Sequence, residues 1–236
     1  MSVYVVSDLH GVPVRVFQRL LATAGFGKDD FCFVLGDVVD RGEHGVALLK
    51  YMMLQPNMQL LLGNHEAMML DCAFLFNEVT EDTVDELSGR DLDAYRRWMH
   101  NGAEPTLRAL RKQTPEMREA ILAYVKEAPL FERITVGEEN FVLVHAGLPS
   151  EDGYGARPPE ECTEMELLWT RPHLTDDFSF AYTTVFGHTP TGYFGKALDG
   201  RILRTRTWID IDVGAAYGYA PAMLRLDDMR EFYLGK

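Results

Sequence analysis

An apolar run that ends in a polar turn, FCFVLGDVVDRG at residues 31–42, constrains the fold of this chain more than any other stretch. Four consecutive apolar residues at 31–34, followed by Leu35, are typical of a strand that is buried on both faces. Gly36 interrupts the pattern, and Asp37 begins a polar turn. The stretch therefore predicts a buried strand that places a carboxylate at its C-terminal end.

The same construction occurs four more times, each as a short apolar run that stops at Asp, Asn or His beside a glycine. The copies are VYVVSDLHG at 3–11, MQLLLGNHE at 58–66, NFVLVHAG at 140–147 and YTTVFGHTP at 182–190. In open α/β sheets, sites form outside the carboxyl ends of the strands. The pattern thus predicts one crevice lined by metal-ligand residue types, namely Asp8, His10, Asp37, Asn64, His65, His145 and His188.

Length and charge limit the classes of protein to consider. The 236 residues fit one α/β domain, and we expect a single domain over 1–236. The formal net charge of −13 argues against nucleic acid or an anionic membrane as the main partner, because both would be repelled. An anionic substrate would therefore need metal ions that neutralise it locally.

Cysteine usage and the N-terminus suggest a cytoplasmic location. Cys32, Cys72 and Cys162 are widely spaced and odd in number, which is typical of reduced cysteines that bind no metal. The first strand pattern begins at once, without a charged leader, and no stretch approaches the roughly 20 apolar residues of a membrane helix. The oligomeric state stays open.

The order of the elements predicts parallel strands joined by helices. Helical spacing at 12–26, ended by Gly25, follows the first strand, and a second helix at 43–55 is closed by Pro56. Residues 67 to about 130 show helical patterns without a convincing strand, so we expect a helical insertion there, with a break at NGAEP. Its acidic part, 78–93, suits a solvated face, and a role in substrate selection stays open.

The remainder of the chain returns to strands. The sequence ERITVGEENFVLVHAG at 132–147 predicts a hairpin that turns at GEEN. We expect a loop at 149–161, a helical segment at LLWTRP (167–172), and C-terminal strands that turn at Asp227 and Asp228.

Taken singly, these motifs are weak, because an Asp that follows a strand is commonly a helix N-cap. Together and in order, SDLHG, GDVVDRG, LLGNHE, HAG and GHTP resemble the metallophosphoesterases of the phosphoprotein phosphatase (PPP) family, in particular its small bacterial and phage-type members. The resemblance extends from Asp8 to about Tyr217. It implies a four-layer αββα fold, with two mixed sheets packed together and flanked by helices. Ser7 stands where the family commonly has Gly, and we expect no loss from this departure.

The resemblance also implies a centre of two divalent metal ions. In the family pattern Asp8 and His10 bind the first ion, Asp37 bridges both, and the second ion is bound by Asn64, His145 and His188. Oxygen and imidazole ligands suit manganese, which we prefer, and also iron or zinc. A water molecule that is deprotonated between the ions would be the nucleophile.

Catalytic roles follow from the same resemblance. Arg41 is expected to bind the phosphate oxygens through its planar fork of donors, with a salt bridge on the loop as the alternative. His65 is expected to be the general acid that protonates the leaving oxygen. Asp40 would orient His65 and raise the pKa of its imidazole. Glu66 is expected to be a structural hydrogen-bonding residue.

Two weaker candidates complete the site. Arg171 in LLWTRP resembles a second phosphate-binding residue, and Tyr217 in IDVGAAYG lies where relatives can place a residue at the rim of the site. His44, His100 and His173 belong to no motif and are expected to be ordinary surface or core residues.

The function expected from this set is hydrolysis of phosphomonoesters, with phosphoserine or phosphothreonine on proteins preferred. The alternative substrate is a dinucleoside polyphosphate such as diadenosine tetraphosphate, whose hydrolases share these motifs. The net charge disfavours a metal-dependent nuclease. A catalytically silent scaffold for phosphorylated partners is the alternative from another class, and the complete set of ligands and the Asp40–His65 pair disfavour it.

Overall fold

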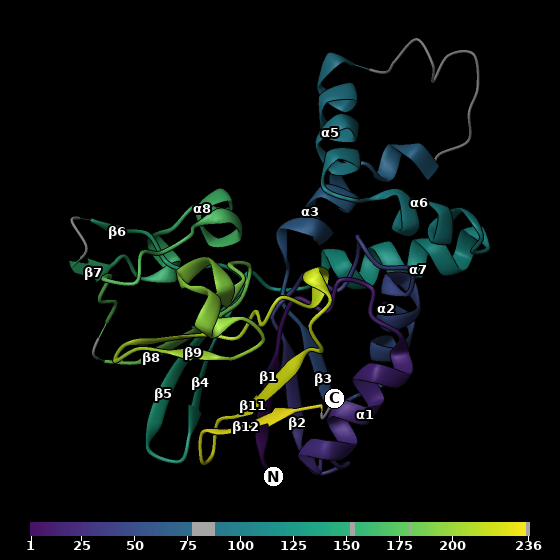
Figure 1. Cartoon of the computed structure of the whole chain (residues 1–236). Helices are drawn as coiled ribbons and strands as arrows, with labels where there is room; N and C mark the ends of the chain where they lie inside the picture. Colours follow the sequence, from purple (N-terminus) through teal and green to yellow (C-terminus); the bar gives the residue numbers. More distant parts are fainter. Residues whose placement is uncertain (77–87, 152–153, 180, 235–236) are drawn as a thin grey trace.

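The computed structural model describes residues 1–76, 88–151, 154–179 and 181–234, and it contains two five-stranded mixed sheets (Figure 1). The strand order is β12-β11-β1-β2-β3 in the first sheet and β4-β5-β8-β10-β9 in the second. The strands are β1 (Val3–Val6), β2 (Phe31–Val34), β3 (Met58–Leu60), β4 (Phe131–Val136), β5 (Glu139–Val144), β8 (Thr183–Phe186), β9 (Leu203–Arg204), β10 (Trp208–Asp210), β11 (Ala222–Arg225) and β12 (Arg230–Tyr233).

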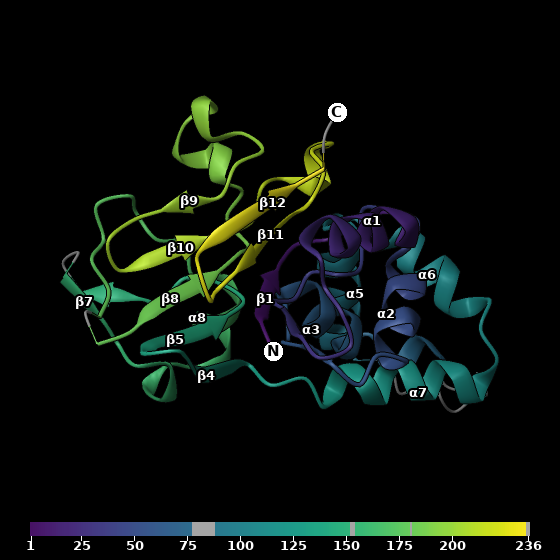
Figure 2. The ribbon, with the colours of Figure 1, turned by 90° about the horizontal axis from the view of Figure 1, so that it is seen from below.

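Apolar side chains fill three spaces, which gives the expected four layers. Figure 2 shows the first sheet between the second sheet and most of the helices. One cluster lies between the first sheet and most of the helices, a second between the two sheets, and a third between the second sheet and α8. The helices are α1 (Val14–Ala24), α2 (Gly45–Met53), α3 (Asn64–Asp71), α5 (Gly89–His100), α6 (Glu104–Arg111), α7 (Pro115–Lys126) and α8 (Glu164–Trp169). The predicted fold class is therefore confirmed.

The first three strands are parallel, as the order of the elements predicts. Val3 pairs with Phe31, and Cys32 pairs with Met58, in parallel register. Helix α1 ends where Gly25 adopts a left-handed φ of 75°, which other residues rarely adopt. This arrangement places the carboxyl ends of β1, β2 and β3 at one edge of the sheet.

The segment after α3 is helical within its described residues, as expected. The helical pattern over 91–112 forms two helices, α5 and α6, because the chain breaks at Asn101 and Gly102. Most of the acidic stretch at 78–93 lies outside the described residues, so its expected solvated face stays a prediction. The described part of the chain has no helix long and apolar enough to cross a membrane.

Two local predictions are wrong. The helical segment expected at LLWTRP (167–172) is helical only to Trp169, where α8 ends, because Pro172 disfavours a helical conformation in the residues before it. The segment at 149–161, expected to be a loop, contains a short antiparallel pair, β6 (Ser150–Glu151) and β7 (Tyr154–Ala156). Gly155 and the prolines that follow hide this pair from a search for alternating apolar residues. The hairpin of β4 and β5 and the C-terminal turn between β11 and β12 are as predicted, and Cys32, Cys72 and Cys162 are free thiols.

Candidate metal centre

The turns that follow five strands bring the predicted ligand residues together. All of these side chains are buried. Two groups among them could each hold a metal ion: His10, Asp37 and His65 form the first, and Asp37, His145 and His188 form the second. The loops after β1, β2, β5 and β8 supply, in that order, Asp8 with His10, Asp37, His145 and His188, and the first turn of α3, which follows β3, supplies Asn64 with His65. The structure thus brings these side chains together at the ends of the strands, and their roles as ligands stay predictions.

Several residues of these loops have an unfavourable backbone conformation with a positive φ. Seven residues other than glycine have a positive φ in the described part of the chain, and six of them lie in these loops. They are Asp8, His10, Asp37, Asp40, Arg41 and His188. Such backbone conformations are unfavourable for side chains larger than glycine, and they persist where the surrounding structure enforces them. The loops are therefore held in place to aim their side chains.

Asp37 lies between the two groups, with one carboxylate oxygen facing each. Its Oδ2 is 3.5 Å from Nε2 of His10 and 3.7 Å from Nε2 of His65. Its Oδ1 is 3.4 Å from Nε2 of His145. On the second side, Oδ1 of Asn64 lies 2.9 Å from His145 Nε2 and 3.0 Å from His188 Nδ1. This geometry is suited to a carboxylate shared by two cations.

Two buried atoms indicate that a cation fits here. Asp8 Oδ1 and His188 Nε2 have no hydrogen-bond partner among the described residues, and a buried polar atom without a partner is costly. Burial raises the pKa of the Asp8 carboxyl, and burial together with the charges of Asp8 and Glu66 raises the pKa of Asp37. A divalent ion would satisfy both the unpaired atoms and the crowded carboxylates.

The imidazole rings are oriented by backbone carbonyls. Nδ1 of His10 lies 3.1 Å from the carbonyl oxygen of Val39, and Nδ1 of His145 lies 2.7 Å from that of Leu35. An N–H donated from Nδ1 leaves the Nε2 lone pair available, which is the usual arrangement for a metal-binding histidine.

Ser7 has a larger role than the sequence suggests. Its hydroxyl donates a hydrogen bond to Asp8 Oδ2, which also accepts the backbone N–H of His188 at 2.9 Å. Both donors occupy Oδ2, so Oδ1 is left facing the centre. A glycine at position 7 could not orient the carboxylate in this way.

Glu66 is a structural hydrogen-bonding residue, as expected. Its buried carboxylate accepts the backbone N–H groups of Asp37 at 2.7 Å, Val38 at 2.8 Å and Val39 at 3.1 Å. These three bonds fix the turn that carries Asp37.

His65, which belongs to the first group, forms a buried pair with Asp40. His65 Nδ1 lies 2.7 Å from Asp40 Oδ2, and His65 Nε2 lies 3.2 Å from Nη2 of Arg41. A guanidinium can only donate, so Nε2 accepts from Arg41 and Nδ1–H donates to Asp40.

The expected raised pKa of His65 is not found. Burial, followed by the positive charge of Arg41, lowers the pKa of His65 to about 2, while burial raises the pKa of Asp40 to about 7. The expectation considered only the neighbouring carboxylate, and it omitted the loss of water around both groups.

The helical insertion supports this pair, which the sequence did not reveal. The indole N–H of Trp98 in α5 donates to Asp40 Oδ2 at 2.9 Å. The backbone N–H of Asp40 donates to the hydroxyl of Thr106 in α6 at 2.9 Å, and that of Arg41 donates to the carbonyl of Gly102 at 2.9 Å. No local motif marks these contacts, because their partners are about 60 residues away along the chain.

Two buried aspartates were also missed. Asp210 is the last residue of β10 and Asp212 follows it, and burial raises the pKa of each carboxyl. Asp212 accepts the backbone N–H of Gly214 at 2.9 Å. The sequence IDIDV at 209–213, in which carboxylates alternate with apolar residues, could have indicated that these aspartates are buried.

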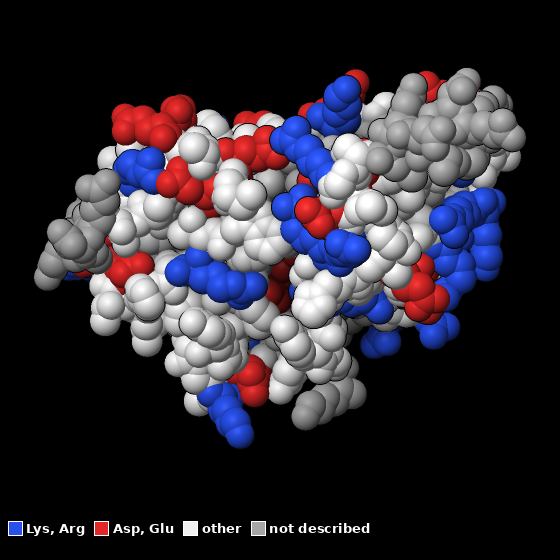
Figure 3. Space-filling view, turned by 90° about the horizontal axis from the view of Figure 1, so that it is seen from above, with Lys and Arg blue, Asp and Glu red and all other residues white. Residues whose placement is uncertain are grey.

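The predicted substrate-binding residues are exposed around the centre. Seen from above, this face has a hollow near its middle, with acidic atoms lying deep between basic side chains (Figure 3). Arg41 is exposed at this edge, and Arg171 and Tyr217 line one cavity of about 470 Å³. The charge of Arg171 contributes, after burial and other charges, to the lowered pKa of His145 and His188, which indicates that it lies near the centre.

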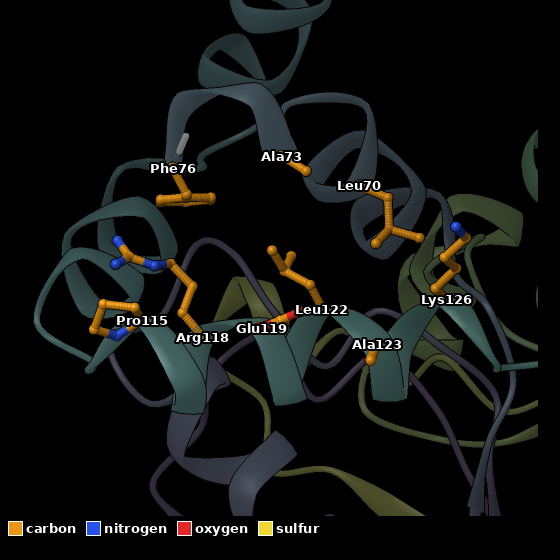
Figure 4. A pocket seen from close by; sticks show the side chains of 9 residues that line it. All are labelled: Leu70, Ala73, Phe76, Pro115, Arg118, Glu119, Leu122, Ala123 and Lys126. Carbon is orange, nitrogen blue, oxygen red and sulfur yellow. The ribbon is translucent and has the colours of Figure 1, made fainter. Parts of the chain in front are cut away.

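Other features lie away from the centre. A groove of about 600 Å³ between α3 and α7 is lined mainly by apolar side chains, with the Arg118 guanidinium 5.2 Å from the ring centroid of Phe76 (Figure 4). None of the predicted site residues is among those that line it. His44, His100 and His173 are exposed, as expected.

Comparison with known proteins identifies the family pattern over most of the chain. The calcineurin-like phosphoesterase family model matches residues 1–213. Serine/threonine-protein phosphatase 2 of Salmonella typhimurium (strain LT2) is 28% identical over 200 residues, which cover 81% of each chain. The symmetrical bis(5′-nucleosyl)-tetraphosphatase of Acidovorax ebreus (strain TPSY) is 30% identical over 151 residues, which cover 63% of this chain.

The matched region spans only 44% of the Acidovorax protein, so less than half of that relative is represented here. Among solved structures, one assigned as a diadenosine tetraphosphatase superposes with a TM-score of 0.65 at 18% identity, covering 99% of this chain and 92% of the other. At that identity the likeness supports the fold.

Proposed function

The chain belongs to the calcineurin-like phosphoesterase family, and on this basis we propose that it hydrolyses phosphate esters at a centre of two divalent metal ions. Manganese is the preferred metal, with iron or zinc as alternatives, because the ligands are carboxylate, amide and imidazole groups.

One observation carries the proposal. The two oxygens of Asp37 face different groups of buried ligands, on opposite sides of one carboxylate. That arrangement suits paired cations, which in phosphate hydrolysis stabilise both the attacking and the leaving oxygen. When bound, the ions would polarise the phosphate and lower the pKa of the water that attacks it.

The residues of the chain supply binding and proton transfer. Arg41 would bind two phosphate oxygens through its fork, and in doing so would leave Nε2 of His65. Nε2 could then carry the proton that the leaving oxygen receives, while Asp40 continues to accept the hydrogen bond from Nδ1–H. In this proposal Arg41 occupies Nε2 of His65 until a bound phosphate takes over the guanidinium.

Phosphoserine or phosphothreonine on proteins is the proposed substrate. The similarity to the Salmonella serine/threonine phosphatase supports it, because the match covers four fifths of both chains. A scaffold without catalysis is disfavoured, since all six predicted metal ligands are buried together and His65 contacts both Asp40 and Arg41.

Diadenosine tetraphosphate is the second candidate substrate. Several relatives at 29–38% identity over parts of the chain are named as symmetrical tetraphosphatases, and a tyrosine-lined cavity opens beside the centre.

A side-by-side assay tests the proposal. We would measure kcat/KM on phosphoserine peptides and on diadenosine tetraphosphate with added manganese. We expect a higher kcat/KM on the peptides. A higher kcat/KM on the dinucleotide would make diadenosine tetraphosphate the first candidate substrate and phosphoserine peptides the second. Hydrolysis of neither substrate, with manganese bound, would contradict the proposed activity.

A further inference from the structure

The corner between α5 and α6, at residues 101–105, contacts the loop that carries Arg41. The backbone N–H of Arg41 donates to the carbonyl of Gly102 at 2.9 Å. The backbone N–H of Asp40 donates to the hydroxyl of Thr106, in the first turn of α6, at 2.9 Å. The sequence indicates only a break between helices here, yet this part of the insertion accepts hydrogen bonds from two neighbouring residues of the candidate site.

Asp40 and Arg41 need such support because both have a left-handed backbone, each with a φ of 66°. Two consecutive residues other than glycine in this conformation are unfavourable, and they persist only where the surrounding structure holds them. On one side the loop packs closely against the turn after β1, since a Cβ on Gly42 would lie 2.4 Å from the carbonyl oxygen of His10. On the other side the insertion accepts both N–H groups. The conformation of Arg41 therefore depends on the helical insertion.

Gly102 also leaves room for the side chain of Arg41. Its own φ is 91°, and a Cβ on it would lie 3.0 Å from Cγ of Arg41 and 3.5 Å from Cα of Arg41. The stem of Arg41 thus passes directly over Gly102, and the guanidinium then reaches His65, with Nη2 3.2 Å from Nε2. A side chain at position 102 would displace this stem. Because bidentate binding requires a correctly aimed fork, the displacement would weaken phosphate binding.

We propose that Gly102 and Thr106 are positioning residues, which hold the guanidinium of Arg41 where a phosphate binds. The inference rests on the proposed phosphate ester hydrolysis, and it assigns the helical insertion a part in substrate binding. Both residues act through the backbone and the stem of the loop at 40–42, so neither touches the substrate. If the insertion instead only covered the first sheet, changes at these two positions would alter stability and leave phosphate binding unchanged.

Two glycine variants separate positioning from backbone strain. Gly102→Ala places a Cβ against Arg41, whereas Gly137→Ala, in the turn between β4 and β5, meets no atom within 4 Å. Gly137 has a φ of 63°, so both variants force alanine into a left-handed conformation. Titration calorimetry of inorganic phosphate into the manganese-loaded chain measures the effect.

Phosphate should bind more weakly to Gly102→Ala alone. A hydrogen bond to a charged group corresponds to about 10-fold or more in affinity, so a poorly aimed Arg41 should raise the Kd by at least about 5-fold. Gly137→Ala should keep the Kd within about 2-fold of the wild type, because it is an exposed position far from the centre.

A double-mutant cycle shows whether Gly102 acts through Arg41. Arg41→Ala removes the stem and the guanidinium, so adding Gly102→Ala to it should change the phosphate Kd by less than about 2-fold. A second loss as large as that of Gly102→Ala alone would mean that Gly102 acts on another group, and it would overturn the inference. Manganese content should equal that of the wild type in Gly102→Ala, and loss of manganese would likewise overturn the inference.

Thr106 gives a test that adds no strain to the backbone. Thr106→Val keeps the shape but removes the acceptor of the Asp40 N–H, so the phosphate Kd should rise by at least about 3-fold. Thr106→Ser restores a hydroxyl and should return the Kd to within about 2-fold of the wild type. Rescue by serine, the smaller side chain, distinguishes the hydrogen bond from packing. These variants decide the inference if Gly102→Ala does not fold.

The outcomes separate the positioning role from the proposed activity. If no phosphate ester is hydrolysed, the proposed function fails, while the phosphate Kd still decides the inference. Hydrolysis of p-nitrophenyl phosphate by the wild type, together with a wild-type Kd in both Gly102→Ala and Thr106→Val, would keep the proposed function and overturn the inference. A wild-type chain that binds no phosphate would also refute it.

Discussion

Replacing Glu66 by alanine should destabilise the chain strongly, although Glu66 is expected neither to bind metal nor to transfer protons. The carboxylate accepts three buried backbone N–H groups, from Asp37, Val38 and Val39. A buried donor left without a partner costs about 1–3 kcal/mol, so three of them predict a loss of about 3 kcal/mol or more in the free energy of unfolding. Such a loss is a large share of the roughly 5–15 kcal/mol typical of a domain.

Urea unfolding at pH 8 measures this loss. The pH matters because burial raises the pKa of Glu66 to about 7, and the ionised carboxylate is the form that accepts all three bonds. Glu66→Gln should lie between wild type and Glu66→Ala, since one carbonyl oxygen can still accept two of the N–H groups. Glu119→Ala, at an exposed position of α7, is the control and should change stability by less than about 0.5 kcal/mol. If Glu66→Ala unfolded at the same urea concentration as Glu119→Ala, the reasoning would be refuted.

The remaining predictions concern phosphate binding and proton transfer to the leaving oxygen. Arg41→Lys keeps the charge but loses the fork, so kcat/KM should fall by about 10-fold or more with metal content unchanged, and an unchanged kcat/KM would reduce Arg41 to a loop residue. His65→Asn should slow phosphoserine peptide hydrolysis by about 10²–10⁴ and p-nitrophenyl phosphate hydrolysis by clearly less, because a serine alkoxide needs the proton more than p-nitrophenolate does. Equal losses on the two substrates would exclude His65 as the acid. Trp98→Phe removes one hydrogen bond to Asp40, worth about 1 kcal/mol, and should give the same ordering with a loss of about 5-fold. If Trp98→Phe had the kcat of the wild type on both substrates, Trp98 would be a packing residue only.

The ligand loops could be predicted from the sequence because their signals are local. In each loop a buried apolar strand, a glycine and the ligand lie within about ten residues, and parallel strands bring their carboxyl ends to one edge. Gly25 likewise marks the end of α1 by its own conformation.

What could not be predicted depends on contacts between distant segments. Trp98 contacts Asp40 only when the helical insertion packs against the loop that contains residues 40–42. The sequence of an amphipathic helix does not indicate which residue its tryptophan will bond. The low pKa of His65 depends on burial, which a sequence motif does not measure. The cavity that Arg171 and Tyr217 line is assembled from the turns after two strands, so Tyr217 was found only through the family resemblance, and Tyr193 was not found.

The carboxylate shared between the two ligand groups is the centre of this account, and one measurement tests it most directly. The chain would be stripped with a chelator and reloaded with manganese, and metal content and p-nitrophenyl phosphate turnover would be measured on the same samples of wild type and Asp37→Asn. We expect two ions per wild-type chain and no turnover before reloading. The variant should lose metal and nearly all activity, because an amide bridges two cations poorly. Two tightly bound ions and a near-normal rate in Asp37→Asn would contradict the account.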